Sequence, residues 1–450
     1  MSIEQHLLSH FKPFAGRDVL VAHSGGVDSQ VLLHALYQTN QQSGLNLHIR
    51  VCHINHGLSP QATQWQAFAQ SQASALNVPF ATESVKLERR NRESLEAVAR
   101  EARYKAIAQH CNEQTIVVTA HHQDDQLETV LLALKRGSGV RGLSAMATHS
   151  SLYGLQVFRP LLLIDRSSIE NYANEKQLSW VEDESNQDEA FDRNFIRHQV
   201  VPILKSRWPS ILNTVSRSAH LCHEADTLLA EVAEEDMRFC RGEQVNALSI
   251  SALKGLTHVR FNNLVRRFLS SQTGAFPSAA QLSQIYFQAI KGQSKQLEIG
   301  LGEYSVRVDK DDLIVTQCFQ DVSDNVINVA EPQKSQQIVL PDYLGLLKLN
   351  EASRGSDANG GKTLDLLPPK DDEVMSIRFA HDNPKCLPDY RQRSRDLKKV
   401  LQELEIPSWK RKRIPFIYYN NQLVAVAGYF VCQPFMAKTD DRITLSWIKQ

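Results

Sequence analysis

Residues 16–165 alternate short apolar runs with longer segments whose apolar positions recur at helical spacing. Apolar runs typical of buried strands lie at Val19–Ala22, Leu47–Asn55, Phe80–Val85 and Thr115–Ala120. Segments with helical periodicity separate them, near residues 28–39, 61–76, 94–110 and 124–135. This alternation predicts a mostly parallel sheet covered by helices on both faces. Ligands of such sheets bind at the carboxyl ends of the strands.

The pattern changes twice after this alternating region. Residues 209–292 show helical spacing, and residues 296–318 show short alternating runs that are typical of β-hairpins. A polar stretch near 320–337 predicts a linker, and the chain beyond it is rich in strand-like runs. We therefore expect an α/β fold in three parts: a doubly wound parallel sheet over residues 1–208, a mainly helical middle domain over 209–320, and an α+β domain over 338–450.

Composition narrows the class of protein. The 450 residues carry 50 Lys and Arg against 50 Asp and Glu, so any basic surface must be local. The seven cysteines are scattered, and none forms a Cys-x-x-Cys pair, which disfavours a zinc ribbon, an iron–sulfur cluster or a disulfide framework. Reduced thiols, together with the lack of an apolar signal segment or a run of membrane-spanning length, predict a cytoplasmic protein with no membrane partner.

Residues Ser24–Ser29 form the most informative motif, Ser-Gly-Gly-Val-Asp-Ser, between the predicted strand Val19–Ala22 and a helical segment. Glycines let the backbone approach an anion, and the free N–H groups of a helix N-terminus point at it. The two serines add hydroxyl donors, and Asp28 could hold a Mg²⁺ ion that neutralises phosphates. The alternative is a plain turn before a well-capped helix. The strand and helix on either side favour a phosphate site.

A second polar cluster, His121–Thr129, follows the predicted strand Thr115–Ala120. Its acidic residues Asp124 or Asp125 and Glu128 fall on one helical face with His121. Carboxylates are favoured in a first helical turn, and their hard oxygens suit Mg²⁺. Acids at this position are also frequent as helix caps, whereas a zinc site of the His-Glu-x-x-His type does not fit the pattern. The shared sheet edge with the glycine motif favours a role in binding metal and nucleotide.

Two histidines and two arginines extend the set of candidates. His53 and His56 lie at the end of the second predicted strand and could line the same cleft, although such histidines are more often structural hydrogen-bonding groups. Arg193 and Arg197 lie one helical turn apart, a spacing that suits recognition of phosphate or carboxylate. The alternative for the arginines is solvation, or salt bridges to neighbours such as Glu189.

Residues 378–413 form a locally basic segment in this neutral chain. They hold eleven Lys and Arg against five acids, with Tyr390 and Trp409 interleaved. Such a segment suits phosphate backbones, and its aromatic residues are available for base stacking. A charge run is usually only a solvated face, but an excess of this size favours RNA binding.

These motifs together resemble a known family. The Ser24–Ser29 motif resembles the PP-loop of ATP pyrophosphatases, and nearly the whole chain is similar to the tRNA(Ile)-lysidine synthetase family. The resemblance is carried by Ser24–Ser29, His53–Leu58, His121–Thr129, Leu134–Gly139, Trp180–Asn186, Asp192–Arg197 and Leu397–Lys399. One departure lies near the C-terminus, where such proteins often show Gly and Arg before Leu-Lys-Lys and this chain has Arg391–Arg395.

The resemblance implies a two-step ligation on tRNA. ATP would adenylate the 2-carbonyl oxygen of the wobble cytidine in a tRNA(Ile) with a CAU anticodon, releasing pyrophosphate. The side-chain amine of free L-lysine would then displace AMP and give lysidine.

The resemblance also implies roles for single residues. ATP would be bound by Ser24, Gly25, Gly26, Val27, Asp28 and Ser29, and Mg²⁺ by Asp28, Asp124 and Asp125. Catalysis would fall to Asp28, Asp124 and Glu128, and one of the last two would hold and deprotonate the lysine ammonium. The nucleotide and substrate cleft would be lined by His53, His56, His121, Arg193 and Arg197. The tRNA would be bound by Arg391, Arg393, Arg395, Lys398 and Lys399.

Two other functions stand as alternatives. A tRNA cytidine thiolase of the same ATP pyrophosphatase type would need Cys-x-x-Cys pairs, which the sequence lacks. A non-catalytic tRNA-binding or chaperone-like protein conflicts with the intact Ser24–Ser29 motif and the acidic segment beside it. The sequence leaves the oligomeric state open, and a homodimer is compatible with it.

Overall fold

The computed structural model describes residues 2–55, 57, 59–85, 95–292, 297–332, 334–351, 362–437 and 442–449. The chain divides into two compact units, Met1–Leu229 and Ala230–Gln450. The predicted cleft residue His56 lies outside the described residues. No helix in these ranges is long and apolar enough to cross a membrane.

The first unit is built on a sheet that has six strands in the described ranges, in the order β3-β2-β1-β4-β6-β5. The strands are β1 (Asp18–Ala22), β2 (His48–Asn55), β3 (Phe80–Ser84), β4 (Ile116–Val118), β5 (His149–Leu152) and β6 (Leu155–Phe158). All neighbouring pairs are parallel except β5 with β6, which is an antiparallel hairpin at the edge. The predicted mostly parallel sheet is therefore confirmed.

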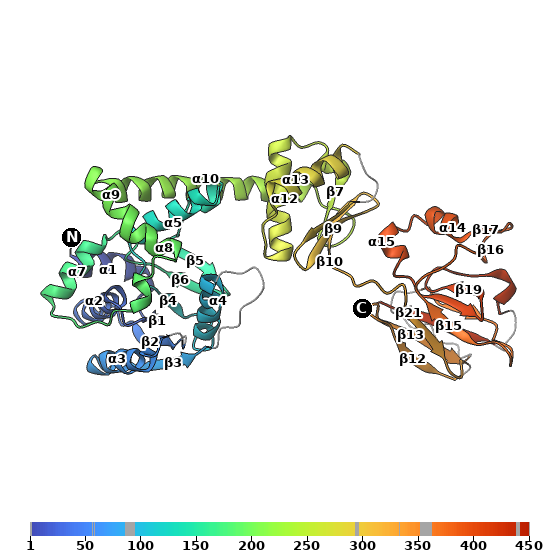
Figure 1. Cartoon of the computed structure of the whole chain (residues 1–450), viewed down its shortest axis with the longest axis horizontal. Coiled ribbons are helices and arrows are strands. Elements are labelled where there is room, and N and C mark those ends of the chain that lie inside the picture. Colours follow the sequence, from blue (N-terminus) through green and yellow to red (C-terminus); the bar gives the residue numbers. More distant parts are fainter. Residues whose placement is uncertain are drawn as a thin grey trace. The chain divides into compact units, whose positions relative to one another are not determined.

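Helices cover both faces of this sheet (Figure 1). The helices are α1 (Ile3–Phe11), α2 (Val27–Ser43), α3 (Ala62–Ala75), α4 (Leu95–Ala108), α5 (Gln123–Lys135), α6 (Val140–Leu143), α7 (Arg166–Glu175), α8 (Asp192–Phe195) and α9 (Val201–Arg207). Val19 and Val21 of β1 pack with α1, α2 and α7, whereas Leu20 packs on the other face with Tyr104 of α4. Because β1 is buried on both faces, its run is continuously apolar.

The strand order places a crevice at one point of the sheet. The chain proceeds from β1 to β2 and β3 on one side, and β4 then lies on the other side of β1. Ligands of doubly wound sheets bind where the order reverses, beyond the carboxyl ends of the strands. The motif Ser24–Ser29, called the glycine loop below, follows β1, and the acidic segment His121–Thr129, which forms the start of α5, follows β4. Both predicted motifs therefore meet at this crevice.

The second unit begins within the long helix α10 (Ile211–Phe239). It contains α11 (Ile250–Leu253), α12 (His258–Thr273) and α13 (Ala279–Ile285), and an antiparallel sheet of β7 (Ala247–Ser249), β8 (Glu298–Leu301), β9 (Tyr304–Asp309) and β10 (Asp312–Gln317). The predicted hairpins are confirmed by β8 to β10, although Gln296 at the start of the predicted range lies outside the described residues. The prediction of unbroken helical structure over 209–292 is wrong at β7, because pairing with β10 turns these three residues into an edge strand.

The rest of this unit is rich in antiparallel strands. One sheet contains β11 (Val326–Val329), β15 (Met375–Arg378), β18 (Phe416–Tyr419), β19 (Gln422–Val426) and β20 (Phe430–Val431). A second contains β12 (Gln336–Val339), β13 (Leu346–Glu351), β14 (Leu364–Leu366) and β21 (Ile443–Ile448). A short pair, β16 (Lys385–Cys386) and β17 (Arg395–Asp396), precedes α14 (Leu397–Glu403) and α15 (Ser408–Arg411).

The predicted linker over 320–337 is wrong in part. Residues Val326–Val329 form an edge strand that pairs antiparallel with β15. Only the last of its residues is buried, so the segment is polar enough to be taken for a linker from sequence alone.

Candidate functional site

The glycine loop Ser24–Ser29 joins β1 to α2 at the carboxyl edge of the sheet. Gly25 has φ +91°, a backbone conformation that favours glycine. A Cβ atom there would also lie only 2.7 Å from Cγ2 of Val181, so space is a second reason for glycine. The backbone N–H of Val181 donates to the Gly25 carbonyl at 3.0 Å and holds the loop in place. Gly26 is the N-cap of α2 and offers no side chain to the helix end, which leaves the N–H groups of Val27 and the residues after it for an anion.

The two serines of the loop interact with each other. The Ser29 hydroxyl donates to the Gly26 carbonyl at 2.9 Å and accepts from the backbone N–H of Ser24 at 3.2 Å. The two hydroxyl oxygens lie 3.2 Å apart. Ser29 therefore closes the loop, and both serines line the space in front of it.

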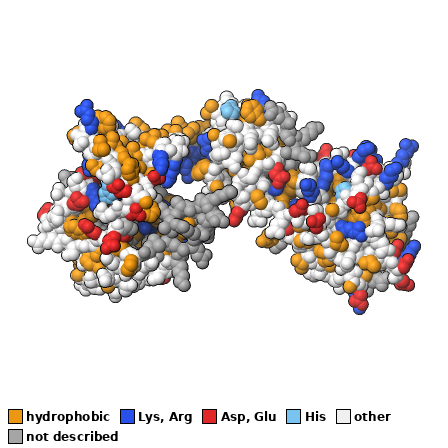
Figure 2. Space-filling model, viewed as in Figure 1, with side chains coloured by type: hydrophobic (Ala, Val, Ile, Leu, Met, Phe, Trp, Pro, Cys, Tyr) orange, Lys and Arg blue, Asp and Glu red, His pale blue; other side chains and the backbone are white. Residues whose placement is uncertain are grey.

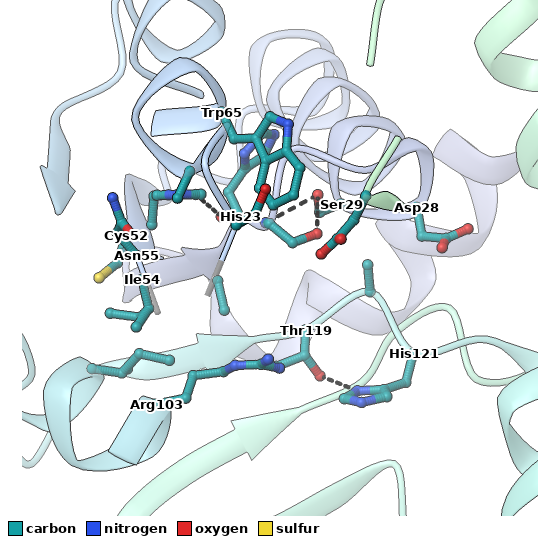
Figure 3. A pocket seen from close by; sticks show the side chains of 18 of the residues that line it. His23, Asp28, Ser29, Cys52, Ile54, Asn55, Trp65, Arg103, Thr119 and His121 are labelled. Carbon is teal, nitrogen blue, oxygen red and sulfur yellow. Dashed lines mark hydrogen bonds between the residues drawn. The ribbon is translucent and has the colours of Figure 1, made fainter. Parts of the chain in front are cut away.

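A cavity of about 590 Å³ lies in front of the glycine loop (Figure 3). Its walls come from the loop, the end of β2, the start of α3, one face of α4, the segment after β4 and the start of α5. Asp183, Glu184 and Arg197 complete the lining. The predicted site residues that line it are Ser24, Asp28, Ser29, His53, His121, Asp125 and Arg197. The cavity is open enough and large enough for a nucleotide.

Two carboxylates of α5 are bound by two arginines. Glu128 is 1 % exposed and accepts from Nε of Arg193 at 2.8 Å and from Nε of Arg197 at 2.7 Å. Asp125 accepts from Nη2 of both arginines at 3.1 Å. A π-helical turn, Ile196–Val200, follows α8 directly, and Arg193 and Arg197 lie on either side of its start. The arginines therefore pair with α5 and not with Glu189.

This network sets the charge states of its members. Burial alone would raise the pKa of Asp125, but His122 and Arg193 lower it below its usual range. Burial alone would lower the pKa of Arg193, but Asp125 and Glu128 raise it. Asp125 and Arg193 are therefore held in their charged forms, and their opposite charges offset one another.

Asp124 belongs to a different local network from Asp125. Its carboxylate accepts from Nζ of Lys205 at 2.9 Å and from the backbone N–H of Arg166 at 2.9 Å. Burial would raise the pKa of Asp124, but these two hydrogen bonds hold it below its usual range. Neither Asp124 nor Glu128 lines the cavity among the described residues.

Asp28 is the carboxylate of the site with an unsatisfied oxygen. Its Oδ1 is buried without a hydrogen-bond donor in the described structure, and the side chain as a whole remains 30 % exposed. Burial raises the pKa of Asp28, and the charges of His122 and Arg166 offset this only in part. Asp28 and Asp125 both approach Nε2 of His122, at 3.7 and 3.4 Å, so the two carboxylates flank one imidazole.

These observations bear on the predicted Mg²⁺. A buried carboxylate oxygen without a donor is a group that a cation would satisfy. The described residues nevertheless contain no group of three or more His, Cys, Asp or Glu side chains that could hold a metal ion. Asp28 therefore fits Mg²⁺ as one ligand that phosphate oxygens and water would complement. Both oxygens of Asp125 already accept hydrogen bonds, Oδ1 from Arg193 and Arg197 and Oδ2 from the backbone N–H of His122. The oxygens of Asp124 are already used by Lys205 and Arg166.

The histidines of the cavity are neutral structural groups in this state. Nδ1 of His53 donates to the His23 carbonyl at 2.9 Å, and Nδ1 of His121 lies 2.8 Å from Oγ1 of Thr119. Burial lowers the pKa of His121 to about 3. His121 is therefore uncharged at neutral pH and can accept or donate one hydrogen bond.

Comparisons with known proteins match most of this chain. Family models described as a PP-loop domain, a TilS substrate binding domain and a TilS substrate C-terminal domain match residues 1–204, 248–314 and 375–447. The tRNA(Ile)-lysidine synthase of Pectobacterium atrosepticum is 41% identical over 92% of this chain and 90% of its own length. That of Yersinia pseudotuberculosis is 38% identical over 96% of both chains. This chain belongs to the tRNA(Ile)-lysidine synthase family.

A further relative and a solved structure complete the comparison. The synthase of Coxiella burnetii is 36% identical over 94% of this chain and 91% of its own length. A U34-tRNA thiolase from Methanococcus maripaludis, which carries a [4Fe-4S] cluster, is similar over 49% of this chain and 78% of its own, with 14% identity and a TM-score of 0.41. The predicted membership of the lysidine synthetase family is confirmed by the curated relatives.

Several residues that line the cavity of this family member were missed by sequence reasoning. Trp65 of α3 and Arg103 and Tyr104 of α4 all reach the cavity. A single Trp or Arg in a helical segment gives no motif. The position of Trp65 along the chain could have predicted its place at the cavity. The first turn of a helix that follows a parallel strand lies at the carboxyl edge of the sheet, and Trp65 is in such a turn.

His23 was missed as well, and its tautomer is fixed by its neighbours. Nε2 of Gln30 donates to Oε1 of Gln72 at 2.7 Å, so Oε1 of Gln30 accepts from Nε2 of His23 at 2.9 Å. Nδ1 of His23 is then an acceptor, and it is buried without a partner in the described structure. Burial lowers the pKa of His23 to about 4, which keeps the ring neutral.

The predicted tRNA-binding residues lie together in the C-terminal part of the second unit. Figure 2 shows Lys and Arg side chains gathered over α14 and α15. Three of the predicted residues have acidic partners: Arg391 and Arg395 pair with Glu403, and Lys399 lies 3.7 Å from Asp396. Within the described ranges, no ion pair is found for the side chains of Arg393 and Lys398, which are exposed.

Proposed function

We propose that this chain ligates lysine to the wobble cytidine of a tRNA(Ile) with a CAU anticodon and converts it to lysidine. It is an ATP-consuming ligase that acts on tRNA, as its family membership shows. The observation that carries the conclusion is the match to curated lysidine synthases over nine-tenths of both chains. The free lysine and the CAU anticodon are the proposed part.

We propose that adenylation takes place in the cavity in front of the glycine loop. O2 of the cytidine attacks the α-phosphorus of ATP, the bond to the β-phosphate oxygen breaks, and pyrophosphate leaves. The N–H groups at the start of α2 would hold the leaving phosphates. Asp28 would hold a Mg²⁺ ion that offsets phosphate charge. Asp125 and Asp124 are the other proposed ligands, available if Asp125 releases an arginine and Asp124 releases Lys205.

We propose that two carboxylates of α5 serve the second step, Asp124 directly and Glu128 indirectly. The lysine amine attacks C2 of the adenylated cytidine, and AMP leaves with the oxygen. Asp124 already accepts from an ammonium group, that of Lys205 at 2.9 Å, so an exchange of ammonium groups would let it hold and deprotonate the substrate lysine. Glu128, bound by Arg193 and Arg197, would position these two guanidinium groups beside the cavity.

We propose a division of labour along the chain. Residues 1–208 would adenylate and ligate, whereas residues 209–320 and 338–450 would bind the tRNA. Arg391, Arg393, Arg395, Lys398 and Lys399 would contact its phosphates. We also propose that the protein forms a homodimer and is cytoplasmic. The seven free thiols support the proposed location.

The two steps can be separated by experiment. We expect exchange of labelled pyrophosphate into ATP that requires the CAU tRNA and proceeds without lysine. Addition of lysine should then convert exchange into net release of AMP. A tRNA whose wobble base is uridine is the control and should support neither. Exchange that is independent of tRNA, or net AMP release without lysine, would contradict the proposed order.

A further inference from the structure

Trp65 is an aromatic side chain of the cavity that the steps above do not use. It lies in the first turn of α3 and lines the cavity. In Figure 3 its indole is drawn on the same side of the cavity as His23 and Ser29, which also line it. One turn later, Phe68 lies 3.9 Å from the position of a Cβ atom on Gly25. The face of α3 that carries both aromatic residues is therefore turned toward the loop.

The cavity has a polar part and an apolar part. Asp28, His121, Asp125 and Arg197 make up the polar part, next to the start of α5. The other part is the more apolar one, lined by Ile54, Pro60, Ala62, Trp65, Tyr104 and Ile107 together with the polar side chains of Asn55 and Arg103. In Figure 3, Ile54 and Asn55 lie on the opposite side of the picture from Asp28 and His121.

A nucleotide bound by its phosphates must place its base in one of these parts. The phosphates belong at the N-terminus of α2, and the polar part is needed for the reacting cytidine and the amine. The base of the nucleotide is then left with the apolar part, where a flat aromatic surface offers stacking.

We infer that Trp65 forms a wall of the adenine subsite and stacks on the base of ATP. The inference rests on the proposed function for the identity of the nucleotide and deepens it by naming the residue that binds the base. The wide indole covers a purine better than the smaller ring of a pyrimidine. Trp65 thus contributes to nucleotide affinity through the base and not through the phosphates.

Binding of AMP and of pyrophosphate to the full-length protein tests this inference. Both ligands are titrated by calorimetry into the unmodified protein, Trp65→Ala and Trp65→Phe. Trp65→Ala should weaken AMP binding on the order of 10- to 100-fold and leave pyrophosphate binding unchanged. Trp65→Phe keeps an aromatic face and should retain most of the AMP affinity. Trp208→Ala, which removes an exposed indole outside the cavity, should change neither.

Other outcomes would overturn the inference. An equal loss of AMP and pyrophosphate binding in Trp65→Ala would mean that the indole only supports the glycine loop. Unchanged AMP binding would mean that it does not touch the base. These measurements need no turnover, so they are independent of lysine transfer. If Trp65→Ala loses AMP affinity but the unmodified protein never modifies tRNA, the inference about Trp65 stands and only the proposed function is overturned.

Discussion

Asp28 combines, in one side chain, a cost to folding and a proposed role in the reaction. Its Oδ1 is buried without a donor, and burial raises its pKa. A raised folded-state pKa means that the ionised carboxylate is less favourable in the folded protein than in the unfolded chain. At neutral pH the protein therefore holds a charge that weakens its own stability, as expected of a group kept for a cation.

Replacement of this carboxylate should separate stability from activity. Asp28→Asn should abolish tRNA-dependent pyrophosphate exchange while the free energy of unfolding at pH 7 stays equal or rises. The stability difference should vanish below about pH 3.9, the ordinary pKa of Asp, because both states are then protonated. Urea unfolding at several pH values and the exchange assay measure the two effects. Glu113→Gln, an exposed carboxylate, is the control. Retained exchange in Asp28→Asn would rule out the assigned role.

Gly25 gives a second prediction at this scale, because it meets both a backbone and a steric limit. Gly25→Ala should lose about 1–2 kcal/mol of stability from its left-handed backbone, and should also lose pyrophosphate exchange as Val181 is pushed away. Gly44 has φ +67° with no atom within 4 Å of an added Cβ, so Gly44→Ala should lose similar stability and keep exchange. Equal loss of exchange in both variants would indicate a general effect on folding.

Between elements, the ion pairs join α5 to α8 and the π-helical turn after it. Glu128 is fully buried, so its charge depends on Arg193 and Arg197. Removal of both partners leaves a buried carboxylate without compensation, which typically costs about 3–5 kcal/mol. The pairs therefore fix the position of Arg197 at the cavity as well as the packing of the helices.

The double variant Arg193→Met/Arg197→Met should lower the free energy of unfolding by about 3–5 kcal/mol. Addition of Glu128→Gln to this variant should restore part of the stability, because the uncompensated charge is then gone. Denaturant unfolding of the double and triple variants provides the comparison. A triple variant that is less stable than the double variant would show that Glu128 is not destabilised by the loss of its partners.

Prediction from the sequence worked best where a local pattern and the tertiary structure agree. The buried strand β1 and the helix α2 follow from periodicity, and the glycine loop between them follows from its motif. The edge strand β11 could not be predicted, because its pairing with β15 is non-local and only one of its four residues is buried. Likewise, no local sequence signal predicts the hydrogen bond from Lys205 to the Asp124 carboxylate, because 81 residues separate the two.

For the whole molecule, tRNA affinity should depend on basic residues that have no acidic partner. Arg393→Ala/Lys398→Ala should weaken tRNA binding and lower the slope of log K against log salt by roughly 0.7–0.9 for each phosphate that the protein no longer neutralises. The turnover number at saturating tRNA should persist, because the cavity is untouched. Lys334→Ala/Lys370→Ala removes the same charge elsewhere in the second unit and is the control. Equal slopes for both pairs would contradict a specific role for the α14 region.

The measurement that tests lysidine formation most directly is incorporation of labelled lysine into tRNA. The full-length protein is incubated with ATP, labelled L-lysine and a tRNA(Ile) transcript with a CAU anticodon, and the nucleosides of the product are separated. We predict label in one nucleoside at the wobble position, dependent on ATP and absent from a transcript with uridine there. Tight tRNA binding and ATP hydrolysis without labelled nucleoside would contradict the proposed activity.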